Sequence, residues 1–454
     1  MSPNTALPAP ALPTAARTPG SHWRRLGVLS CLLSLSACAG LRPPVAAVAD
    51  DRCTEVPIAR STRLHAVAFD SGLPTAGQWR DGFVLQDMNG DSQLDLVHGP
   101  TREGDGMPAI FLGDGLGHYA RWSQARFPPV AQDYGNVASA DFNQDGLPDL
   151  ALAAHLRGMA TYLNEGGNFA PWGEGLTLLS PGLRANPGAY SSREIATVDW
   201  NGDGLPDLAS VNEGPAMYAP DAASTDAFVL HLNRAGYWER VNGEQTTQGF
   251  GSALAVGDVD GDGRPDAMLG LDIAGNRKLL QINTGQSFRS RELQSLPADA
   301  ATTAVALQPR SRPGMQIVAA SRGNLGGQMC VALQTIELDA DQEQSRWLWR
   351  EPGRVAVEAL VSADLNRDGR ADLIAARSDG SMLTFLGTRT GYVRDVDLPA
   401  PAAYAGCTPY HAAVVALGPD QQQLLVSYAG EPDTFQPDRC PTQGGFAAWT
   451  LSVR

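Results

Sequence analysis

Short apolar runs separated by turn-forming residues make up most of the chain after residue 60. Examples are residues 150–154, 208–211 and 373–376, each of which follows an acidic, glycine-rich turn. Apolar runs of this length between Gly, Pro, Asn and Asp are typical of β-strands, because a buried helix needs a longer periodic segment. The stretch before each turn is rich in Ala, Gly, Ser and Val, which suits a strand in a crowded interior. The pattern predicts an all-β chain.

The turns themselves form one nine-residue acidic loop that occurs five times. Its copies begin at residues 87, 141, 199, 258 and 364 and follow the pattern D-x-[DN]-x-D-[GS]-x-x-D. An alternative interpretation is a set of solvated hairpins that bind nothing, but the same four positions repeat in all five places. The side chains at positions 1, 3, 5 and 9 are Asp87, Asn89, Asp91, Asp95, Asp141, Asn143, Asp145, Asp149, Asp199, Asn201, Asp203, Asp207, Asp258, Asp260, Asp262, Asp266, Asp364, Asn366, Asp368 and Asp372.

This spacing predicts calcium binding. Ca²⁺ takes about six to eight oxygen ligands in a loose geometry, and carboxylate or amide oxygens at positions 1, 3, 5 and 9 could converge on one ion. Glycine at position 6 permits a sharp reversal of the chain. A helical calcium hand would need Glu at position 12, and the residues there are His98, Leu152, Ser210, Leu269 and Ala375. We therefore expect about five structural Ca²⁺ ions in loops between strands.

These repeats resemble the FG-GAP/VCBS repeats of integrin α-subunit heads and of many bacterial exported proteins. Phe250 and Gly251 open the copy that matches best. The resemblance implies a β-propeller with calcium in the loop between the first and second strands of a blade. It is specific for the fold and the metal, and it says little about the ligand.

The repeat period predicts seven blades. Successive loops begin 54, 58, 59 and 106 residues apart, and the last interval is twice 53. We therefore expect one blade without an acidic loop at residues 305–320 and another at 414–427. Residues 61–454 divided by seven give about 56 residues a blade, enough for four strands. Residues 64–69 should form the outer strand of the last blade, which would close the ring and remove exposed edges.

A second repeated element is the sequence around Asn164, Asn233 and Asn283, which predicts hairpins between third and fourth strands. An aromatic residue follows each hairpin (Phe169, Tyr237 and Phe288), and we expect it to pack between blades.

The N-terminus has the features of an export signal. Residues 1–37 contain three Arg and no acidic residue, and their apolar stretch at 26–37 is too short to span a bilayer. The sequence Leu-Ser-Ala-Cys ending at Cys38 resembles a bacterial lipobox, which implies cleavage before Cys38 and lipidation of that residue. Ala39 then favours the outer membrane of a Gram-negative envelope. We expect residues 38–60 to be a lipidated, flexible tether and residues 61–454 to be the propeller.

The net charge adds to this interpretation. Removal of residues 1–37 changes the formal charge from −15 to −18, because 31 basic and 49 acidic residues remain. Sixteen of the acids are the loop aspartates, so close carboxylates should repel one another without metal, and calcium should be coupled to folding. An acidic chain without a basic face argues against nucleic acid as a partner.

Four cysteines besides Cys38 belong to the mature chain, and they allow three pairings. An oxidising compartment permits disulfides. In a propeller of seven blades, the segment entering the last blade and that blade's second-to-third loop lie on one face, which favours Cys407 with Cys440. Cys53 with Cys330 is then the remaining pair.

Two classes of function remain. The first is a calcium-stabilised binding or scaffold module, anchored in the envelope by lipid alone, with a protein or glycan ligand on the face opposite the acidic loops. The second is a polysaccharide lyase acting on uronates at the mouth of the propeller channel, with His155, Tyr190 and Arg193 as its catalytic candidates. The sequence contains no HExxH, GxSxG or GxxxxGK[ST] motif.

Overall fold

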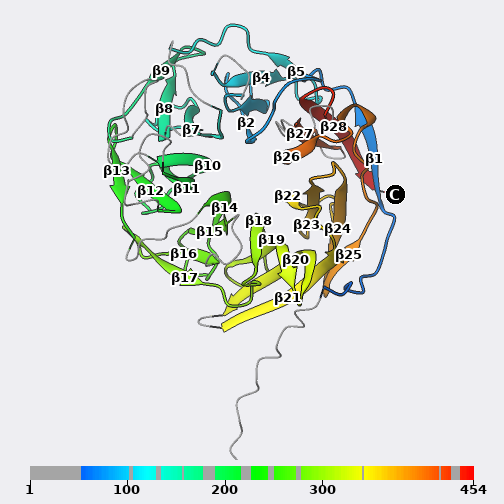
Figure 1. Ribbon diagram of the computed structural model, residues 1–454. Coiled ribbons are helices and arrows are strands. Elements are labelled where there is room, and N and C mark those ends of the chain that lie inside the picture. Colours follow the sequence, from blue (N-terminus) through cyan, green and yellow to red (C-terminus); the bar gives the residue numbers. More distant parts are fainter. Residues whose placement is uncertain are drawn as a thin grey trace, which may run out of the picture. The chain divides into compact units, whose positions relative to one another are not determined.

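Seven four-stranded antiparallel sheets form a ring in the computed structural model of the protein. Figure 1 shows them as propeller blades around a common axis. The structure describes residues 53–101, 106–128, 134–155, 158–176, 190–215, 226–243, 250–271, 278–339, 342–418, 421–430 and 440–453. The predicted all-β, seven-bladed propeller is therefore confirmed. The signal segment 1–37 and Cys38 lie outside the described residues.

Each of the first six blades runs outward from its innermost strand in chain order. Blades 1 to 3 consist of β2 (Phe83–Gln86), β3 (Asp95–His98), β4 (Ala109–Gly113) and β5 (Tyr119–Arg121), then β6 (Val137–Ala140), β7 (Asp149–Ala154), β8 (Gly158–Asn164) and β9 (Phe169–Pro171), then β10 (Tyr190–Val198), β11 (Asp207–Pro215), β12 (Phe228–Asn233) and β13 (Trp238–Val241). Blades 4 to 6 consist of β14 (Gly251–Gly257), β15 (Asp266–Leu271), β16 (Leu279–Asn283) and β17 (Phe288–Glu292), then β18 (Ala300–Pro309), β19 (Met315–Leu325), β20 (Gln328–Asp339) and β21 (Gln342–Pro352), then β22 (Val357–Ala363), β23 (Asp372–Arg377), β24 (Met382–Thr388) and β25 (Gly391–Arg394).

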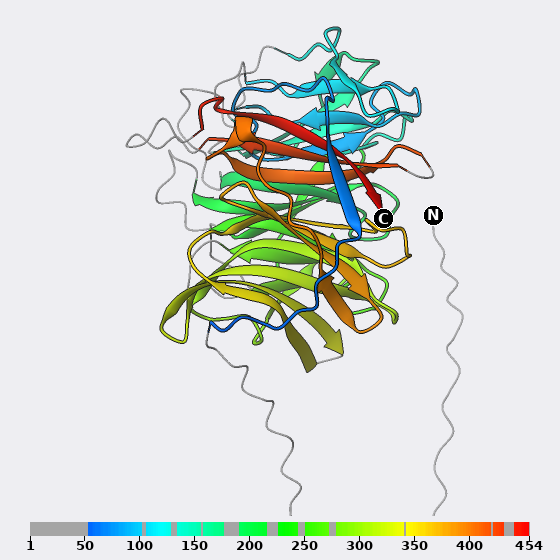
Figure 2. The same ribbon diagram turned by 90° about the vertical axis from the view of Figure 1, so that its right-hand side faces the viewer.

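The seventh blade closes the ring with strands from both ends of the chain. Its inner strands are β26 (Thr408–Ala416), β27 (Gln422–Ala429) and β28 (Gly444–Val453), and its outer strand is β1 (Leu64–Phe69), as predicted. Strands β1 and β28 pair from Leu64 opposite Val453 to Phe69 opposite Ala448, and Figure 2 shows them side by side in blue and red. A short 3-10 helix, η1 (Ala402–Tyr404), precedes the blade.

The core lies between neighbouring blades. The middle strands are buried along their whole length, for example β7, β12, β15 and β16. Phe169 and Phe288 are buried between blades as expected, but Tyr237 is 52% exposed and its neighbour Trp238 is buried instead. The buried aromatic of blade 3 therefore lies one residue later than predicted, five residues after Asn233, as in the two other hairpins. Blades 5 and 7 lack acidic loops, which agrees with the repeat period.

The segment before the first strand differs from the expected flexible tether. Residues 53–60 lie against the propeller, because Cys53 forms a disulfide with Cys330 and Ile58 packs on the core between blades 5 and 6. The amide of Arg394 also donates to the carbonyl of Ala59 at 2.8 Å. Among the described residues, no helix has the length and hydropathy that crossing a membrane requires.

Candidate functional site

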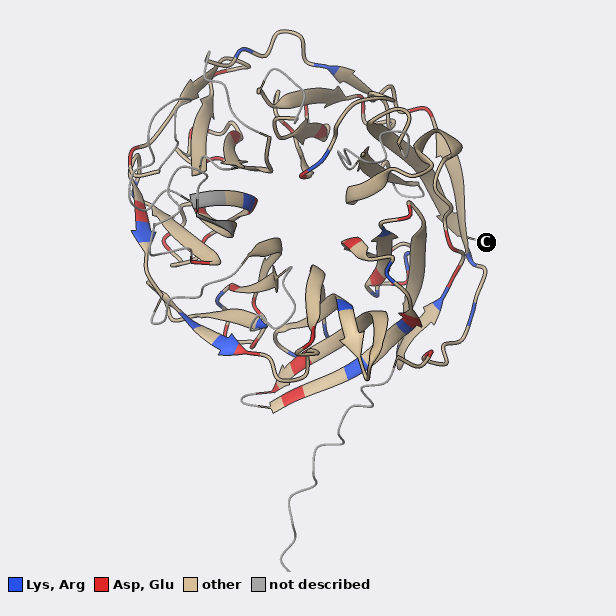
Figure 3. Ribbon diagram, in the orientation of Figure 1, with Lys and Arg blue, Asp and Glu red and all other residues tan. Residues whose placement is uncertain are grey.

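All five acidic loops join the first and second strands of a blade, so they lie on one face of the ring. Acidic positions recur from blade to blade in Figure 3. Within each loop the carboxylates accept hydrogen bonds from the loop's own backbone. In the third loop, Asp199 accepts from the amides of Gly202 and Gly204 at 2.8 and 3.0 Å, and Asp203 accepts from Leu205 at 2.9 Å. Equivalent bonds occur in the other loops, so backbone amides orient these side chains in all five copies.

Two positions in every loop have the left-handed backbone conformation. Position 6 does so in all five copies, including Ser92 with φ of 69°. Position 4 does so as well, including Gln144 and Arg367 with φ of 60° and 58°. Non-glycine residues adopt this conformation at a cost, so the loop imposes the same turn even where the residue is not glycine. The sequence pattern indicated the turn at position 6 but not the one at position 4.

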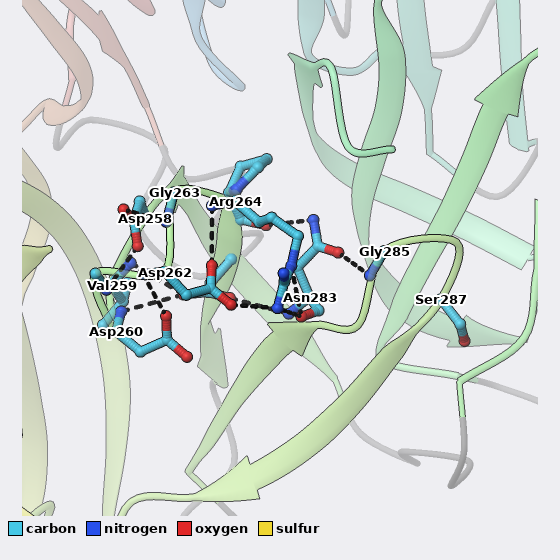
Figure 4. Close-up of polar contacts among 12 residues, drawn as sticks. Asp258, Val259, Asp260, Asp262, Gly263, Arg264, Asn283, Gly285 and Ser287 are labelled. Carbon is cyan, nitrogen blue, oxygen red and sulfur yellow. Dashed lines mark hydrogen bonds and ion pairs between the residues drawn. The ribbon is translucent and has the colours of Figure 1, made fainter. Parts of the chain in front are cut away.

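The fourth loop has the most complete set of metal-ligating groups. Asp258, Asp260 and Asp262 each offer an oxygen atom within 4.8 Å of the others, and Figure 4 shows them around the tip of the loop. Arg264 forms an ion pair with Asp262. Clustered carboxylate oxygens, backed by amides and partly exposed, are the donor set that calcium prefers. The residues present therefore fit a calcium ion.

Position 9 has a second role that sequence reasoning missed. Asp207 is fully buried, and its two oxygens accept from the amides of Trp200 and Asn233, both at 2.8 Å. Asp266 likewise accepts from Val259 and Asn283, both at 2.9 Å. These aspartates fasten the acidic loop to the end of the third strand of the same blade.

Burial dominates the electrostatics of position 9. Desolvation raises the pKa of Asp95, Asp149, Asp207 and Asp372 to about 6 and that of Asp266 to about 7, although amide hydrogen bonds lower it in each case. A nearby cation would oppose this effect, because it favours the charged form.

The hairpin asparagines connect neighbouring blades. The side-chain amide of Asn233 in blade 3 donates to the carbonyl of Phe142 in the acidic loop of blade 2 at 2.9 Å. Asn283 donates to Trp200 at 2.7 Å in the same way, and Asn164 donates to Met88 at 2.9 Å. In the sequence these asparagines predicted only turns.

The carbonyls that receive these bonds belong to position 2 of the acidic loops. The position-2 side chains are at most 2% exposed and pack into the next blade. A signal was present in the sequence, because position 2 is always large and apolar within an otherwise polar loop. These residues are Met88, Phe142, Trp200, Val259 and Leu365.

The opposite face of the ring contains a repeated irregularity in the innermost strands. In blades 3 to 7 the pairing of the first two strands shifts by one residue near the start of the inner strand, which is the mark of a β-bulge. Bulges redirect side chains and are frequent beside binding sites. The extra residues are Arg193, Ser252, Thr303, Glu358 and Tyr410, and we call them the channel-mouth ring.

A half-buried carboxyl lies next to this ring. Glu194 accepts a hydrogen bond from the side-chain amide of Asn136 at 2.6 Å. Burial raises the pKa of Glu194 to about 8, while Arg193 lowers it and Asp81 raises it further. Asp81 has φ of 73°, and its neighbour Arg80 lies over the ring of Tyr410 at 4.7 Å. Perturbed carboxyls and backbone strain concentrate at functional sites.

The three lyase candidates are only partly described. The ring of His155 stacks on Tyr134 with 4.4 Å between centroids, and Arg193 is beside Glu194. Tyr190 begins strand β10, and its side chain lies outside the described part of the structure. The described contacts do not bring these three side chains together.

Two disulfides tie the propeller. Cys407 pairs with Cys440 and holds the entry to blade 7 against that blade's second-to-third loop. Cys53 pairs with Cys330 at the start of strand β20.

Comparison with known proteins agrees with this architecture. A family model described as FG-GAP-like repeat matches residues 87–152, 141–210 and 199–269, and each match begins at position 1 of an acidic loop. Phosphatidylinositol-glycan-specific phospholipase D from Bos taurus is 27% identical over an alignment of 184 positions, and the match covers 36% of this chain and 22% of that protein.

Solved structures share the fold. BBS1N, crystallised in complex with ARL6DN, has a TM-score of 0.52 and 15% identity, with 87% of this chain and 98% of that chain covered. The BP39L lectin from Burkholderia pseudomallei has a TM-score of 0.51 and 14% identity, with 78% and 94% covered. At these identities the likeness shows the fold alone.

Proposed function

Because the protein is a β-propeller with FG-GAP-like repeats, we propose that it is a calcium-stabilised binding module of the cell envelope. Its metal ligands would be the side chains at positions 1, 3 and 5 of the five acidic loops, with position 9 supporting them. When bound, calcium would neutralise the clustered carboxylates and fix the loop tip. The chain itself would connect each loop to the packing between blades, through the aspartate at position 9 and the hairpin asparagines.

One observation carries the calcium proposal: the same inward-facing set of amide-backed carboxylates appears in five separate blades. Chance acidic hairpins have no reason to repeat two left-handed residues and a buried position-9 aspartate. We expect about five Ca²⁺ per chain. Elemental analysis of the dialysed protein tests this number.

A variant of one acidic loop, compared with a matched control, tests whether the loops hold the calcium. Replacing Asp199 and Asp203 together with Asn should remove about one Ca²⁺ per chain and lower the melting temperature in calcium. Asp299→Asn removes an exposed carboxylate outside the loops and should change neither. Equal calcium content in all three proteins would overturn the assignment of the loops.

The ligand would bind at the channel-mouth ring. Thr303 of this ring is buried and donates to the carbonyl of Val357 at 2.6 Å. The other four redirected side chains surround the start of the inner strands, and Glu194, Asn136 and Asp81 add hydrogen-bonding groups beside them. Such a mixture of charged, amide and aromatic groups suits a glycan or a polar protein surface. Export and lipidation at Cys38 would place this module in the envelope, where both ligands are available.

A glycan array and an envelope-protein array, probed with the calcium-loaded protein, test the ligand site. Replacing Arg193 and Tyr410 with Ala should abolish the selected binding, whereas Arg354→Ala, an exposed change outside the ring, should preserve it. Retained binding by the double variant would exclude the channel mouth. Mass spectrometry of the membrane-extracted protein tests the lipid on Cys38, and an unmodified Cys38 would exclude the anchor.

A further inference from the structure

One blade replaces its acidic loop with a basic one. Residues 310–314, between β18 and β19 of blade 5, have the sequence Arg-Ser-Arg-Pro-Gly. Arginine therefore stands in blade 5 where the five blades with acidic loops have aspartate. This substitution reverses the charge of the loop in a chain whose net charge is −15.

A cleft of about 1000 Å³ opens beside the basic loop, between blades 5 and 6 and residues 56–59. Four guanidinium groups belong to its lining: Arg310, Arg346, Arg370 and Arg389. Among the described residues that line the cleft, Glu337 is the only acidic one. A volume of this size is at the upper end of the range for ligand sites, which is about 300–1,000 Å³.

Two of the charges in and around the cleft are already neutralised. Glu337 pairs with Arg312 at 2.7 Å, and Arg370 pairs with Asp368 of the acidic loop of blade 6. By contrast, the described partners of Arg310 and Arg346 are neutral carbonyls. Arg310 donates to Pro313 and Leu338 at 2.8 and 3.0 Å, and Arg346 donates to Thr390 at 2.9 Å.

Arg389 is exposed and has no ion pair among the described residues. Three positive charges thus remain without an acidic partner in the described part of the cleft. An anion entering between them would find guanidinium groups already oriented by backbone carbonyls, so little side-chain freedom would be lost for Arg310 and Arg346.

The walls of the cleft are amide, hydroxyl and aromatic groups. Gln308 is buried and accepts a hydrogen bond from the hydroxyl of Tyr392, and Gln316 and Thr335 line the same wall. Trp347 supplies an aromatic surface. Sugar rings present hydroxyls at their edges and C–H groups on their faces, and both kinds of surface are available here.

From this arrangement we infer that the cleft between blades 5 and 6 binds an acidic oligosaccharide, with arginines contacting its carboxylate or sulfate groups. Planar guanidinium groups bind such oxyanions through paired hydrogen bonds. The cleft shares no residue with the channel-mouth ring and contains residues from the face of the acidic loops, so this site is additional to the one proposed above and stands without it.

Calorimetric titration of the full calcium-loaded chain tests the inference. The probes are oligogalacturonate, a heparin-derived oligosaccharide, neutral maltohexaose of matched length and a short RNA. We expect at least one acidic probe to bind and maltohexaose not to bind at the same concentration. The better acidic probe identifies carboxylate or sulfate as the preferred group. Affinity should fall as salt rises, because the contacts are partly exposed.

The decisive comparison uses the double variant Arg346→Gln/Arg389→Gln, whose changes are on the protein surface. It should bind the acidic probe about tenfold more weakly, since each lost contact is a charge-assisted hydrogen bond. Arg322→Gln, an exposed change in the same blade outside the cleft, should bind as the unaltered protein does. Equal affinity of the double variant and the unaltered protein would overturn the inference, as would equal binding of maltohexaose or of a short RNA.

Discussion

Replacing Asn233 with Ala should weaken the seam between blades 2 and 3. The side-chain amide is fully buried and makes two hydrogen bonds of different kinds. Its nitrogen donates across the seam to the carbonyl of Phe142 at 2.9 Å, and its oxygen accepts from the amide of Ala235 at 3.0 Å. Alanine removes both and leaves a carbonyl and an amide without these partners.

The expected magnitude follows from those two groups. A buried polar group that loses its partner costs about 1–3 kcal/mol, so the loss of two partners should lower the unfolding free energy by about 2–6 kcal/mol. In a domain of several hundred residues each kcal/mol lowers the melting temperature by about 2 °C or less. A decrease of at most about 4–12 °C is therefore expected.

Urea and thermal unfolding in saturating calcium measure this loss. The control is Asn168→Ala, because Asn168 occupies a comparable hairpin in blade 2 but is exposed and bonds to Glu165 at 3.2 Å. The control should stay within about 0.5 kcal/mol of the unaltered protein. If Asn233→Ala were equally mild, the hydrogen bond across the seam would not stabilise the ring, and the coupling of acidic loops to blade packing would be refuted.

Three further changes give independent tests. Glu194→Gln should alter the pH dependence of stability: the folded pKa of about 8 exceeds the ordinary 4.5, so the folded state holds an extra proton between these values and the unfolding free energy falls as pH rises through them. Melting curves from pH 5 to 9 should show a shallower fall for the variant, and parallel curves would contradict the assignment. Phe142→Ala should cost about 3–5 kcal/mol in urea unfolding, whereas the exposed Tyr237→Ala should cost less than about 0.5 kcal/mol; similar losses would remove the special role of position 2. Replacing Cys53 and Cys330 with Ser should cost about 2–4 kcal/mol, and an unchanged melting temperature would show that the N-terminal segment does not brace the ring.

The blade count could be predicted because it depends on repetition rather than on any single contact. Five loops with one spacing, and one interval of double length, locate both degenerate blades. Closure by β1 followed from the need to protect sheet edges. These features can be read from the sequence alone, because each blade corresponds to one repeat of the chain.

The connections between blades could not be predicted in the same way. Asn233 and Phe142 are 91 residues apart, and neither residue type indicates that they meet. Tyr237 and Trp238 are adjacent aromatics, and only the five-residue spacing from the hairpin asparagine, shared with Phe169 and Phe288, distinguishes the buried Trp238. The bulges of the channel-mouth ring arise from one extra residue per strand, which apolar patterning does not resolve.

The positive charge of the cleft between blades 5 and 6 could not be predicted from the sequence either. Its arginines come from β18–β19, β21, the acidic loop of blade 6 and the β24–β25 hairpin. They are scattered through the sequence, so the chain's strongly negative total conceals a local positive site. Only the ring geometry brings them together.

Calcium content and thermal stability, measured on the same sample, test the central claim most directly. The protein is stripped with a chelator, shown to be metal-free by elemental analysis, melted, and melted again after calcium is restored. We predict about five Ca²⁺ per chain and a melting temperature that rises by several degrees or more on restoration. A restored sample that binds no calcium and melts at the temperature of the stripped protein would contradict the account.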